Sequence, residues 1–269
     1  MDFTEEQIER YSRQIILPEV GGVGQRKIMQ AKVLIIGCGG LGSPCAYYLA
    51  SAGVGKIGLV DSDRVELNNL QRQILHSTHN VGRAKVESAK ERLLSLNPDI
   101  QITTHHLRLT SENTLDVIKD YDLIVDGSDN FPTRYLINDA CVISNKPLFH
   151  AAVLRFDGQA TTIIPHQGPC YRCLFPEPPP PGAVPSCQEA GILGAVAGIL
   201  GVIQSTEVLK YILGKGELLV GKLLVFNALE MSFRKVSIQR SSNCPVCGDK
   251  PTVTELIDYE QFCALRSHP

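Results

Sequence analysis

The sequence predicts an α/β protein with a mixed β-sheet, mostly parallel and with antiparallel strands near the C-terminus. Three observations support this prediction. Short apolar runs alternate with helix-period stretches over residues 32–153, which is the order of parallel βαβ units. A glycine-rich turn at residues 37–42 follows the first apolar run. Two Cys-x-x-Cys pairs, at residues 170–173 and 244–247, predict an additional four-cysteine zinc site.

The first strand and helix form a nucleotide-binding fingerprint. Residues 33–36 are apolar, a helix-period stretch follows the glycine turn, and a second apolar run at 57–60 ends on Asp61. The turn fits G-x-G-x-x-G, with glycines at Gly37, Gly39, Gly40 and Gly42. Glycine lets the backbone turn tightly and approach a phosphate, which the helix N-terminus then binds. We therefore expect a Rossmann-like fold in which Asp61 holds ribose hydroxyls.

Polar and cationic side chains gather just beyond Asp61. They are Asn68, Asn69, Arg72, Gln73 and Lys85. Arginine offers forked donors and lysine a point charge, so this group suits the β- and γ-phosphates of a nucleoside triphosphate. For any single member, the alternative is a solvated polar connection. A dehydrogenase that transfers hydride has no use for such a cluster, so the cluster favours triphosphate chemistry.

The N-terminal segment predicts a short helix. Thr4 is placed to cap it, and it runs toward residues 10–14, where Arg10 and Arg13 fit a solvated helix face. A glycine-rich turn is expected at residues 21–24.

The remaining elements alternate along the chain. Helices are predicted at residues 84–96, 110–119 (capped by Thr110 or Ser111) and 131–145, and strands at 100–106, 121–126, 147–153, 158–164, 222–226 and 232–238. A long apolar helix is expected within residues 187–213. Because glycine lowers helix stability, Gly194, Gly198 and Gly201 indicate close approach of another backbone, at a dimer interface or a tight core crossing.

The strand that ends at Asp126 is expected to deliver Asp129 and Asn130 into a loop. In open α/β sheets the ligand lies outside the carboxyl ends of the strands, so Asp129 should face the glycine turn. A carboxylate beside a triphosphate suits Mg²⁺. The alternative is that Asp129 only caps the helix that begins near Pro132.

Composition limits the class of protein. The chain has 269 residues, 43% of them hydrophobic and 20% charged, which is typical of a globular protein. A formal net charge of −2 argues against a nucleic-acid binder. The acidic N-terminus predicts no signal peptide, and the apolar run at 191–203 is too short and glycine-rich to predict a membrane span. We expect a cytoplasmic protein.

The nine cysteines fall into distinct groups. An odd number without an export signal favours thiols and metal ligands over disulfides. The paired ones, Cys170, Cys173, Cys244 and Cys247, predict a closed structural zinc site. Cys187 follows a proline run at the start of a helix, where the helix dipole favours a thiolate. Cys38, Cys45 and Cys141 are expected in the core.

Together these motifs resemble the ThiF/MoeB/HesA family, the bacterial relatives of ubiquitin-activating enzymes. The glycine turn, Asp61, residues 68–73 and Lys85 carry the resemblance. It extends through the Arg13 segment, the Asp129–Asn130 loop, both Cys-x-x-Cys pairs and Cys187, which is nearly the whole chain. It implies one adenylation domain over residues 1–248, with a tail at 249–269.

The resemblance also implies an activity. Such enzymes adenylylate the C-terminal glycine of a small ubiquitin-like sulfur-carrier protein with ATP and Mg²⁺, which leads to a thiocarboxylate for molybdopterin or thiamine synthesis. Arg13, Arg72, Lys85 and Asp129 would then act on the triphosphate, with Arg13 reaching it across a homodimer interface. Cys187 would take part in the later sulfur or acyl transfer.

The resemblance also implies partners, and alternatives to the implied function remain. The tail resembles the segment that precedes a rhodanese domain in fused relatives, so the sulfur donor is expected to be a separate sulfurtransferase, a rhodanese or a cysteine desulfurase. No nucleic acid or membrane partner is expected. The alternatives are a dehydrogenase, an inactive scaffold, and the same fold acting on a peptide or a modified tRNA base.

Overall fold

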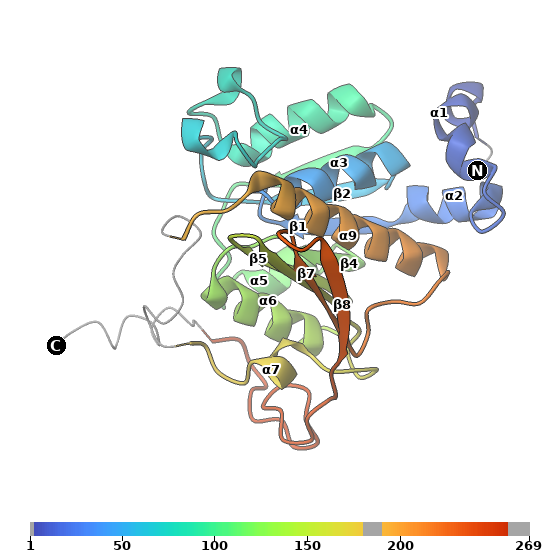
Figure 1. Ribbon diagram of the computed structural model, residues 1–269. Coiled ribbons are helices and arrows are strands. Elements are labelled where there is room, and N and C mark those ends of the chain that lie inside the picture. The colour runs from blue at the N-terminus through green and yellow to red at the C-terminus, as the bar shows by residue number, and fades with distance from the viewer. Residues whose placement is uncertain (1–2, 180–189, 258–269) are drawn as a thin grey trace.

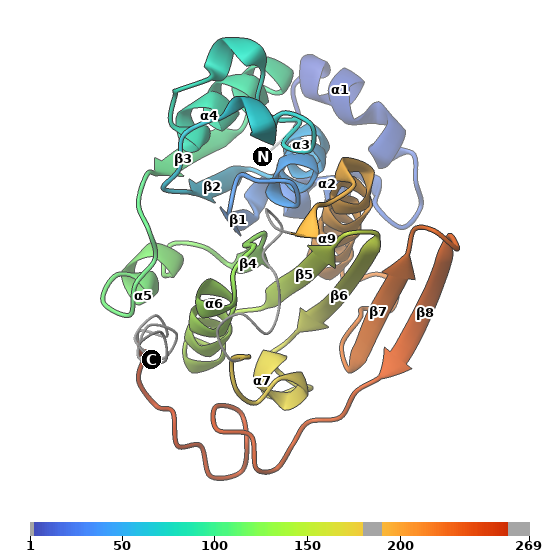
Figure 2. The same cartoon turned by 60° about the vertical axis from the view of Figure 1, so that its left-hand side comes forward.

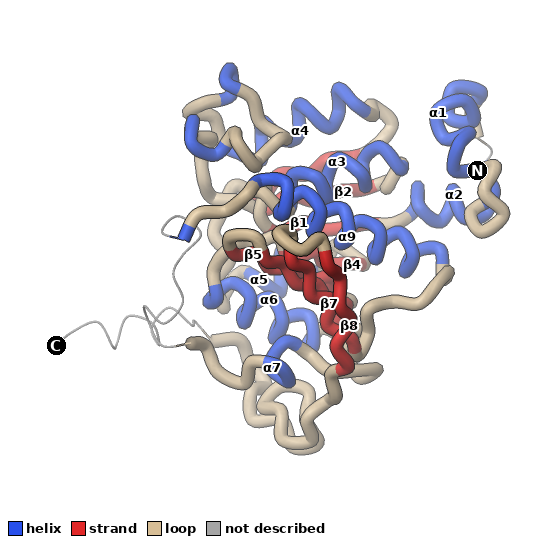
Figure 3. The backbone as a smooth tube through the Cα atoms, in the orientation of Figure 1, coloured by secondary structure: helices blue, strands red, loops and turns tan. Residues whose placement is uncertain are grey.

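The protein is described here by a computed structural model, which covers residues 3–179 and 190–257 and places a mixed β-sheet between two layers of helices (Figure 1; Figure 3). In these residues the sheet has eight strands in the order β3-β2-β1-β4-β5-β6-β7-β8. The strands are β1 (Lys32–Ile36), β2 (Lys56–Val60), β3 (Gln101–His105), β4 (Leu123–Asp126), β5 (Leu148–Leu154), β6 (Asp157–Ile163), β7 (Lys222–Asn227) and β8 (Ser232–Ser237). The first five pair in parallel and the last three add antiparallel, which confirms the predicted mixed sheet.

The helices cover both faces of the sheet. They are α1 (Glu5–Ile15), α2 (Gly21–Gln30), α3 (Gly42–Ala52), α4 (Lys85–Leu96), α5 (Thr114–Ile118), α6 (Phe131–Ile143), α7 (Tyr171–Leu174) and α9 (Gly194–Leu213), with 3-10 turns at Leu67–Asn69 and Thr78–Asn80. Val33 and Ile35 of β1 pack toward α3, α4 and α9, whereas Leu34 and Ile36 pack toward α5 and α6. Side chains alternate along a strand, so an apolar run without polar breaks is buried on both faces.

The antiparallel half of the sheet begins with the β5–β6 hairpin, in which Leu148 pairs with Ile163. β7 and β8 form a second hairpin, and β8 is the edge strand of the sheet (Figure 2). The chain between the two hairpins includes α7 and α9.

α9 is a core helix that crosses close to α3. Added side-chain atoms at Gly194 and Gly201 would overlap the backbone carbonyls of Gln71 and Leu41, whereas Gly198 has no neighbour within 4 Å. The predicted tight crossing is therefore confirmed at two of the three glycines. The 20-residue helix extends beyond the apolar run seen in the sequence. Of the helices described, it alone is long and apolar enough to cross a membrane. Core helices of globular proteins meet the same criteria of length and composition.

Two predicted elements differ from the structure. The glycine-rich segment at residues 21–24 is the first turn of α2, not a turn between elements. Gly24 is there because a side chain would clash with Leu213 of α9, at 2.7 Å. Residues 110–113 are likewise a turn closed by a 2.9 Å bond from the Thr110 N–H to Asn113 Oδ1, so α5 begins only at Thr114.

Candidate functional site

A cavity of about 380 Å³ lies at the carboxyl ends of β1, β2 and β4. β2 lies on one side of β1 and β4 on the other, so the chain changes direction here. Such a switch point is where α/β sheets bind ligands. The cavity wall includes four predicted segments: the glycine turn, the end of β2, residues 72–73 and the loop after β4.

The glycine turn is fixed by close backbone packing. Gly37 has a φ of 93°, and a side chain on it would lie 2.7 Å from the carbonyl oxygen of Gly127. A side chain on Gly42 would overlap the Gly37 carbonyl. Gly37, Gly39 and Gly40 line the cavity, and Gly42 starts α3 behind them. The N-terminus of α3 therefore offers N–H groups and a partial positive charge to an anion.

Asp61 faces the cavity with its carboxylate held by backbone donors. Oδ2 accepts from the Cys38 N–H at 2.8 Å and Oδ1 from the Asp63 N–H at 2.9 Å. Burial raises the pKa of Asp61, although Lys85 and these two donors act in the opposite direction. The carboxylate keeps further lone pairs that can accept hydrogen bonds, and its role in holding ribose hydroxyls stays a prediction.

Lys85 is nearly buried and makes an ion pair that the sequence did not reveal. Its Nζ lies 2.8 Å from Oδ2 of Asp63, and the two side chains are 7% and 66% exposed. The Lys85 N–H also donates to the Asp63 carbonyl. Asp63 lines the cavity, and its position two residues beyond Asp61 at a strand end was the available signal.

The predicted polar cluster divides into two groups. Arg72 and Gln73 line the cavity, and among the described atoms the buried Oε1 of Gln73 has no hydrogen-bond partner. Asn68 and Asn69 do not line it. Asn69 Oδ1 accepts from the Glu66 N–H, and the Asn68 carbonyl accepts from Arg72. These two amides therefore build the turn that carries Arg72.

The loop after β4 brings Asp129 and Asn130 to the cavity. Asn130 caps α6, because its Oδ1 accepts from the Thr133 N–H at 2.9 Å. The cap is thus a different residue from Asp129, whose exposed carboxylate remains at the cavity. Ser128, Arg134 and Arg108 also line it and were not predicted.

Two predicted residues lie elsewhere. Arg13 is exposed on α1 and does not line the cavity of its own chain. Cys187 lies outside the residues that the structure describes. Cys38, Cys45 and Cys141 are buried as predicted, and burial raises the pKa of each thiol.

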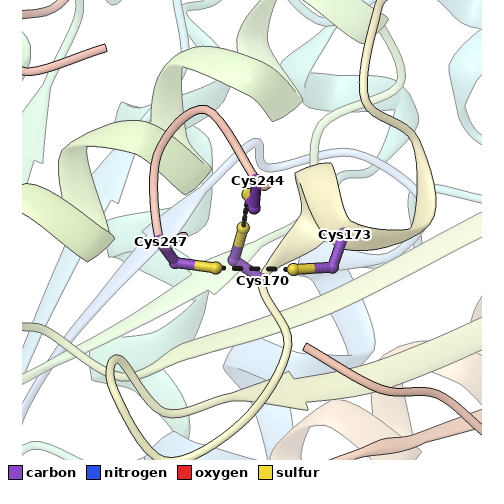
Figure 4. Close-up of side chains that lie close together, drawn as sticks. All are labelled: Cys170, Cys173, Cys244 and Cys247. Carbon is purple, nitrogen blue, oxygen red and sulfur yellow. Dashed lines mark hydrogen bonds between the residues drawn. The ribbon is translucent and has the colours of Figure 1, made fainter. Parts of the chain in front are cut away.

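The two Cys-x-x-Cys pairs meet at a second site (Figure 4). The four sulfur atoms lie within 4.8 Å of one another, with 3.5 Å between Cys170 and Cys244 and 3.4 Å between Cys173 and Cys247. Four sulfurs around zinc, each at about 2.3 Å, would lie about 3.8 Å apart. Hydrogen bonds among the four sulfurs lower the pKa of Cys173 and Cys244 and raise the pKa of Cys170 and Cys247. The group therefore has the geometry of a tetrahedral metal site.

Helix α6 connects the metal site to the cavity. Asn138 accepts from the Tyr171 N–H at 2.8 Å, and Asp139 accepts two bonds of 2.9 Å from Arg172. Tyr171 and Arg172 lie between Cys170 and Cys173 in the chain, so these bonds join α6 to the metal site. The N-terminus of α6 lies at the cavity. One helix thus positions parts of both sites.

Comparisons with curated proteins give relatives of similar sequence. A "sulfur carrier protein adenylyltransferase" of Thermus thermophilus is 52% identical over 271 aligned residues, covering 99% of this chain and all of the relative. "Adenylyltransferase and sulfurtransferase MOCS3" of Culex quinquefasciatus is 50% identical over 97% of this chain. The chain spans 60% of the length of that MOCS3 protein.

The fold is also similar to solved structures. The crystal structure of Escherichia coli MccB with ATP is 28% identical, with a TM-score of 0.78 over 88% of this chain and 74% of MccB. The ThiF family model matches residues 11–246, which include the glycine turn, the cavity and most of the four-cysteine site. From its sequence, its fold and the site that they build, the chain belongs to the ThiF family.

Proposed function

We propose that this protein is an ATP-dependent adenylyltransferase that activates the C-terminal glycine of a small ubiquitin-like sulfur-carrier protein. The observation that carries the proposal is the 52% identity with the Thermus thermophilus enzyme over the full length of both chains. Similarity to MccB, whose solved structures include one with ATP and others with MccA, is lower at 28%. The higher identity with the sulfur carrier protein adenylyltransferase does not favour the alternative acceptors, a peptide or a modified tRNA base.

The cavity suits this chemistry without a general base. A C-terminal carboxylate is ionised at neutral pH and is already a nucleophile. One of its oxygens bonds to the α-phosphorus of ATP, the bond from that phosphorus to the bridging oxygen breaks, and pyrophosphate leaves. The products are an acyl-adenylate and pyrophosphate. The chain has only to align the reactants and stabilise charge on the leaving group.

The cationic side chains at the cavity supply that stabilisation. Lys85 offers a buried ammonium and Arg72 a guanidinium, and both side chains line the cavity. The glycine turn adds N–H donors at the start of α3. Asp61 holds the ribose and so fixes the α-phosphorus relative to these groups.

Two metal ions fit the donor sets present. Asp129 is an exposed carboxylate at a phosphate cavity, which is the donor that Mg²⁺ uses together with phosphate oxygens. When bound there, magnesium would neutralise charge on the leaving pyrophosphate. The four thiolates suit Zn²⁺, and with every coordination position taken by cysteine that site would be structural.

The enzyme is proposed to act as a homodimer in which Arg13 completes the partner's site. Arg13 lies on an exposed face of α1, close in sequence to the exposed apolar residues Ile16 and Leu17. Two inactive variants, Arg13→Ala and Lys85→Ala, should restore part of the activity when mixed. In a two-fold dimer, random exchange leaves about a quarter of the sites intact. No recovery, in a preparation shown by native mass spectrometry to contain mixed dimers, would argue against an arginine supplied in trans.

The main experiment tests adenylylation directly. The protein is incubated with ATP, Mg²⁺ and candidate carriers, and the acyl-adenylate is sought by intact-mass spectrometry alongside pyrophosphate exchange into ATP. Exchange should depend on a carrier with its C-terminal glycine. A carrier that lacks this glycine is the control. Equal exchange with both carriers, or none with any carrier, would overturn the proposal.

A further inference from the structure

A fully buried carboxylate and histidine lie behind the loop that lines the cavity. Asp126 is the last residue of β4, and its Oδ2 lies 2.7 Å from Nδ1 of His150 on β5. Their side chains are 1% and 3% exposed. Neither lines the cavity, and the adenylylation chemistry described above does not use them.

The other oxygen of Asp126 fixes the backbone of the loop. Oδ1 accepts from the Ser128 N–H at 3.0 Å and from the Ser128 hydroxyl at 2.6 Å. Ser128 is held from its other side as well, because its carbonyl accepts from Arg134 of α6 at 3.4 Å. A carboxylate that accepts the N–H two residues later closes a local turn. This turn determines the direction in which Asp129 leaves the strand.

The loop has no room to relax toward the sheet. Gly127 donates to the Ile36 carbonyl at 2.8 Å, and a side chain on Gly127 would meet that oxygen at 3.0 Å. Gln204 of α9 donates to the Asp126 carbonyl at 2.7 Å. The Asp126 carbonyl and the Gly127 N–H are thus both held by hydrogen bonds. The Asp126 side chain then sets the direction of the backbone at Ser128.

A buried carboxylate needs partners to stay ionised and in place. Burial alone would raise the pKa of Asp126, but the His150 and Ser128 hydrogen bonds and the nearby Arg134 charge outweigh it and leave the pKa below its ordinary value. Of these partners in the described part of the chain, His150 is the one that bonds to Oδ2. Without that donor, one oxygen of a fully buried carboxylate has no hydrogen bond. The cost in free energy favours a rotation of the side chain toward another partner.

The geometry of His150 suits a supporting role. Its ring packs edge-on against Tyr171, with centroids 4.9 Å apart, so the imidazole is held by a second contact besides Asp126. Nε2 is buried and has no hydrogen-bond partner within the described part of the chain. A nitrogen sealed from the cavity cannot exchange protons with substrate, so His150 is not a general base here.

We infer that His150 is a positioning residue of the adenylylation site, which acts through Asp126 to set the Ser128–Asp129 backbone against the nucleotide. The inference rests on the proposed function, because one of its two measurements is the rate of carrier-dependent pyrophosphate exchange. Its structural readout, the protection of the Ser128 amide, does not depend on any activity.

The test compares three substitutions of His150. His150→Asn keeps an N–H close to the position of Nδ1, whereas His150→Gln places its amide near Nε2 and His150→Leu has no donor. The matched control is Thr162→Val. It removes the 2.6 Å hydroxyl donor of a different buried carboxylate, Glu207, and neither of those residues lines the cavity.

The expected result separates positioning from stability. Leucine and glutamine should lower kcat for carrier-dependent pyrophosphate exchange by about 10- to 100-fold, the scale of a small misplacement. The KM for the carrier should stay unchanged, and hydrogen exchange of the Ser128 amide should become faster. Asparagine should keep most of the activity and the slow exchange. Thr162→Val should lower the melting temperature without changing kcat.

Several outcomes would overturn the inference. One is a folded leucine or glutamine variant with parental kcat and parental protection of Ser128. Another is equal loss in the asparagine and glutamine variants, which would show that the Nδ1 donor is not what matters. If the leucine variant does not fold, the comparison of asparagine with glutamine decides. Failure of the parental enzyme to exchange pyrophosphate would instead count against the proposed function, and the Ser128 protection would still test the positioning.

Discussion

Lys85 Nζ and Asp63 Oδ2 form a 2.8 Å ion pair at the wall of the nucleotide cavity. Lys85 is the buried partner and Asp63 the exposed one, so the carboxylate holds the ammonium at the cavity rather than taking it into solvent. Asp63 therefore orients Lys85 at the cavity in the absence of nucleotide.

Substitution of the two partners should have unequal effects. Lys85→Ala removes a preorganised charge and should lower pyrophosphate exchange by at least about 100-fold. Asp63→Asn should cost much less, because the amide oxygen still accepts from the ammonium. The control is Lys119→Ala, which breaks a 2.8 Å pair with Asp116 on the surface and should not change the rate. An Asp63→Asn effect as large as that of Lys85→Ala would mean that Asp63 acts on the substrate itself.

The glycines of α9 should respond in opposite directions to alanine. Gly198 has open space beside it, so Gly198→Ala should raise the free energy of unfolding by up to about 1 kcal/mol. Gly201→Ala should lower it, because the methyl group would overlap the Leu41 carbonyl and lie 2.6 Å from Pro44. Urea unfolding of both variants measures the difference. A destabilised Gly198→Ala protein would show that a second surface covers this face of the helix.

Removal of the zinc that we propose for the four-cysteine site should loosen the C-terminal half of the sheet. The purified protein should contain about one zinc per chain by elemental analysis, since four thiolates complete one tetrahedral site. Cys244→Ala should lose the metal and up to about 4 kcal/mol of stability, the entropy of closing a loop of 74 residues. Cys45→Ala, which removes a buried thiol outside the four-cysteine site, should keep the metal. Equal stability of metal-free, fully reduced protein would contradict a structural role.

Ionisation of Asp61 should have opposite effects on the free energy of unfolding and on the affinity for ATP. Burial raises its folded pKa above the ordinary value, so the folded chain binds this proton more tightly than the unfolded chain. Between the two pKa values the free energy of unfolding should therefore fall as pH rises. ATP affinity should rise over the same interval, because the ionised carboxylate is the better acceptor for ribose hydroxyls. Calorimetric titrations and urea unfolding at several pH values measure both slopes.

Asp61→Asn is the reference for that measurement. The amide cannot ionise, so both slopes should flatten. If ATP affinity in the parental protein is flat across the interval, or if the slope persists in Asp61→Asn, another group titrates with binding.

Local patterns were sufficient to predict much of the fold. The strands around the glycine turn were evident because a doubly buried strand has no polar break and because Gly37 and Gly42 admit no other residue. The four-cysteine cluster followed from the spacing of its pairs, and Asp129 from its place after a strand end. Each of these signals lies within a few consecutive residues.

Other features depend on contacts between distant segments. The role of Asp63 depends on Lys85, 22 residues later, and that of Asp126 on His150, 24 residues later. The sequence predicts a turn at the glycines of α2, because the close contact that explains Gly24 is with Leu213, almost 200 residues away in the chain. Asn68 and Asn69 were grouped with the phosphate ligands because composition does not distinguish an amide that binds a ligand from one that builds a turn.

The metal site has a consequence for the order of events during synthesis. Its first thiol pair is made well before its second, since Cys170 and Cys244 are separated by 74 positions. At a ribosomal rate of about 5 to 20 residues per second, that interval lasts roughly 4 to 15 seconds. An ion bound by all four sulfurs can be captured only after α9, β7 and β8 have been translated, because these elements lie between the two cysteine pairs in the chain. Complete capture of zinc at the proposed site therefore follows synthesis of the final hairpin.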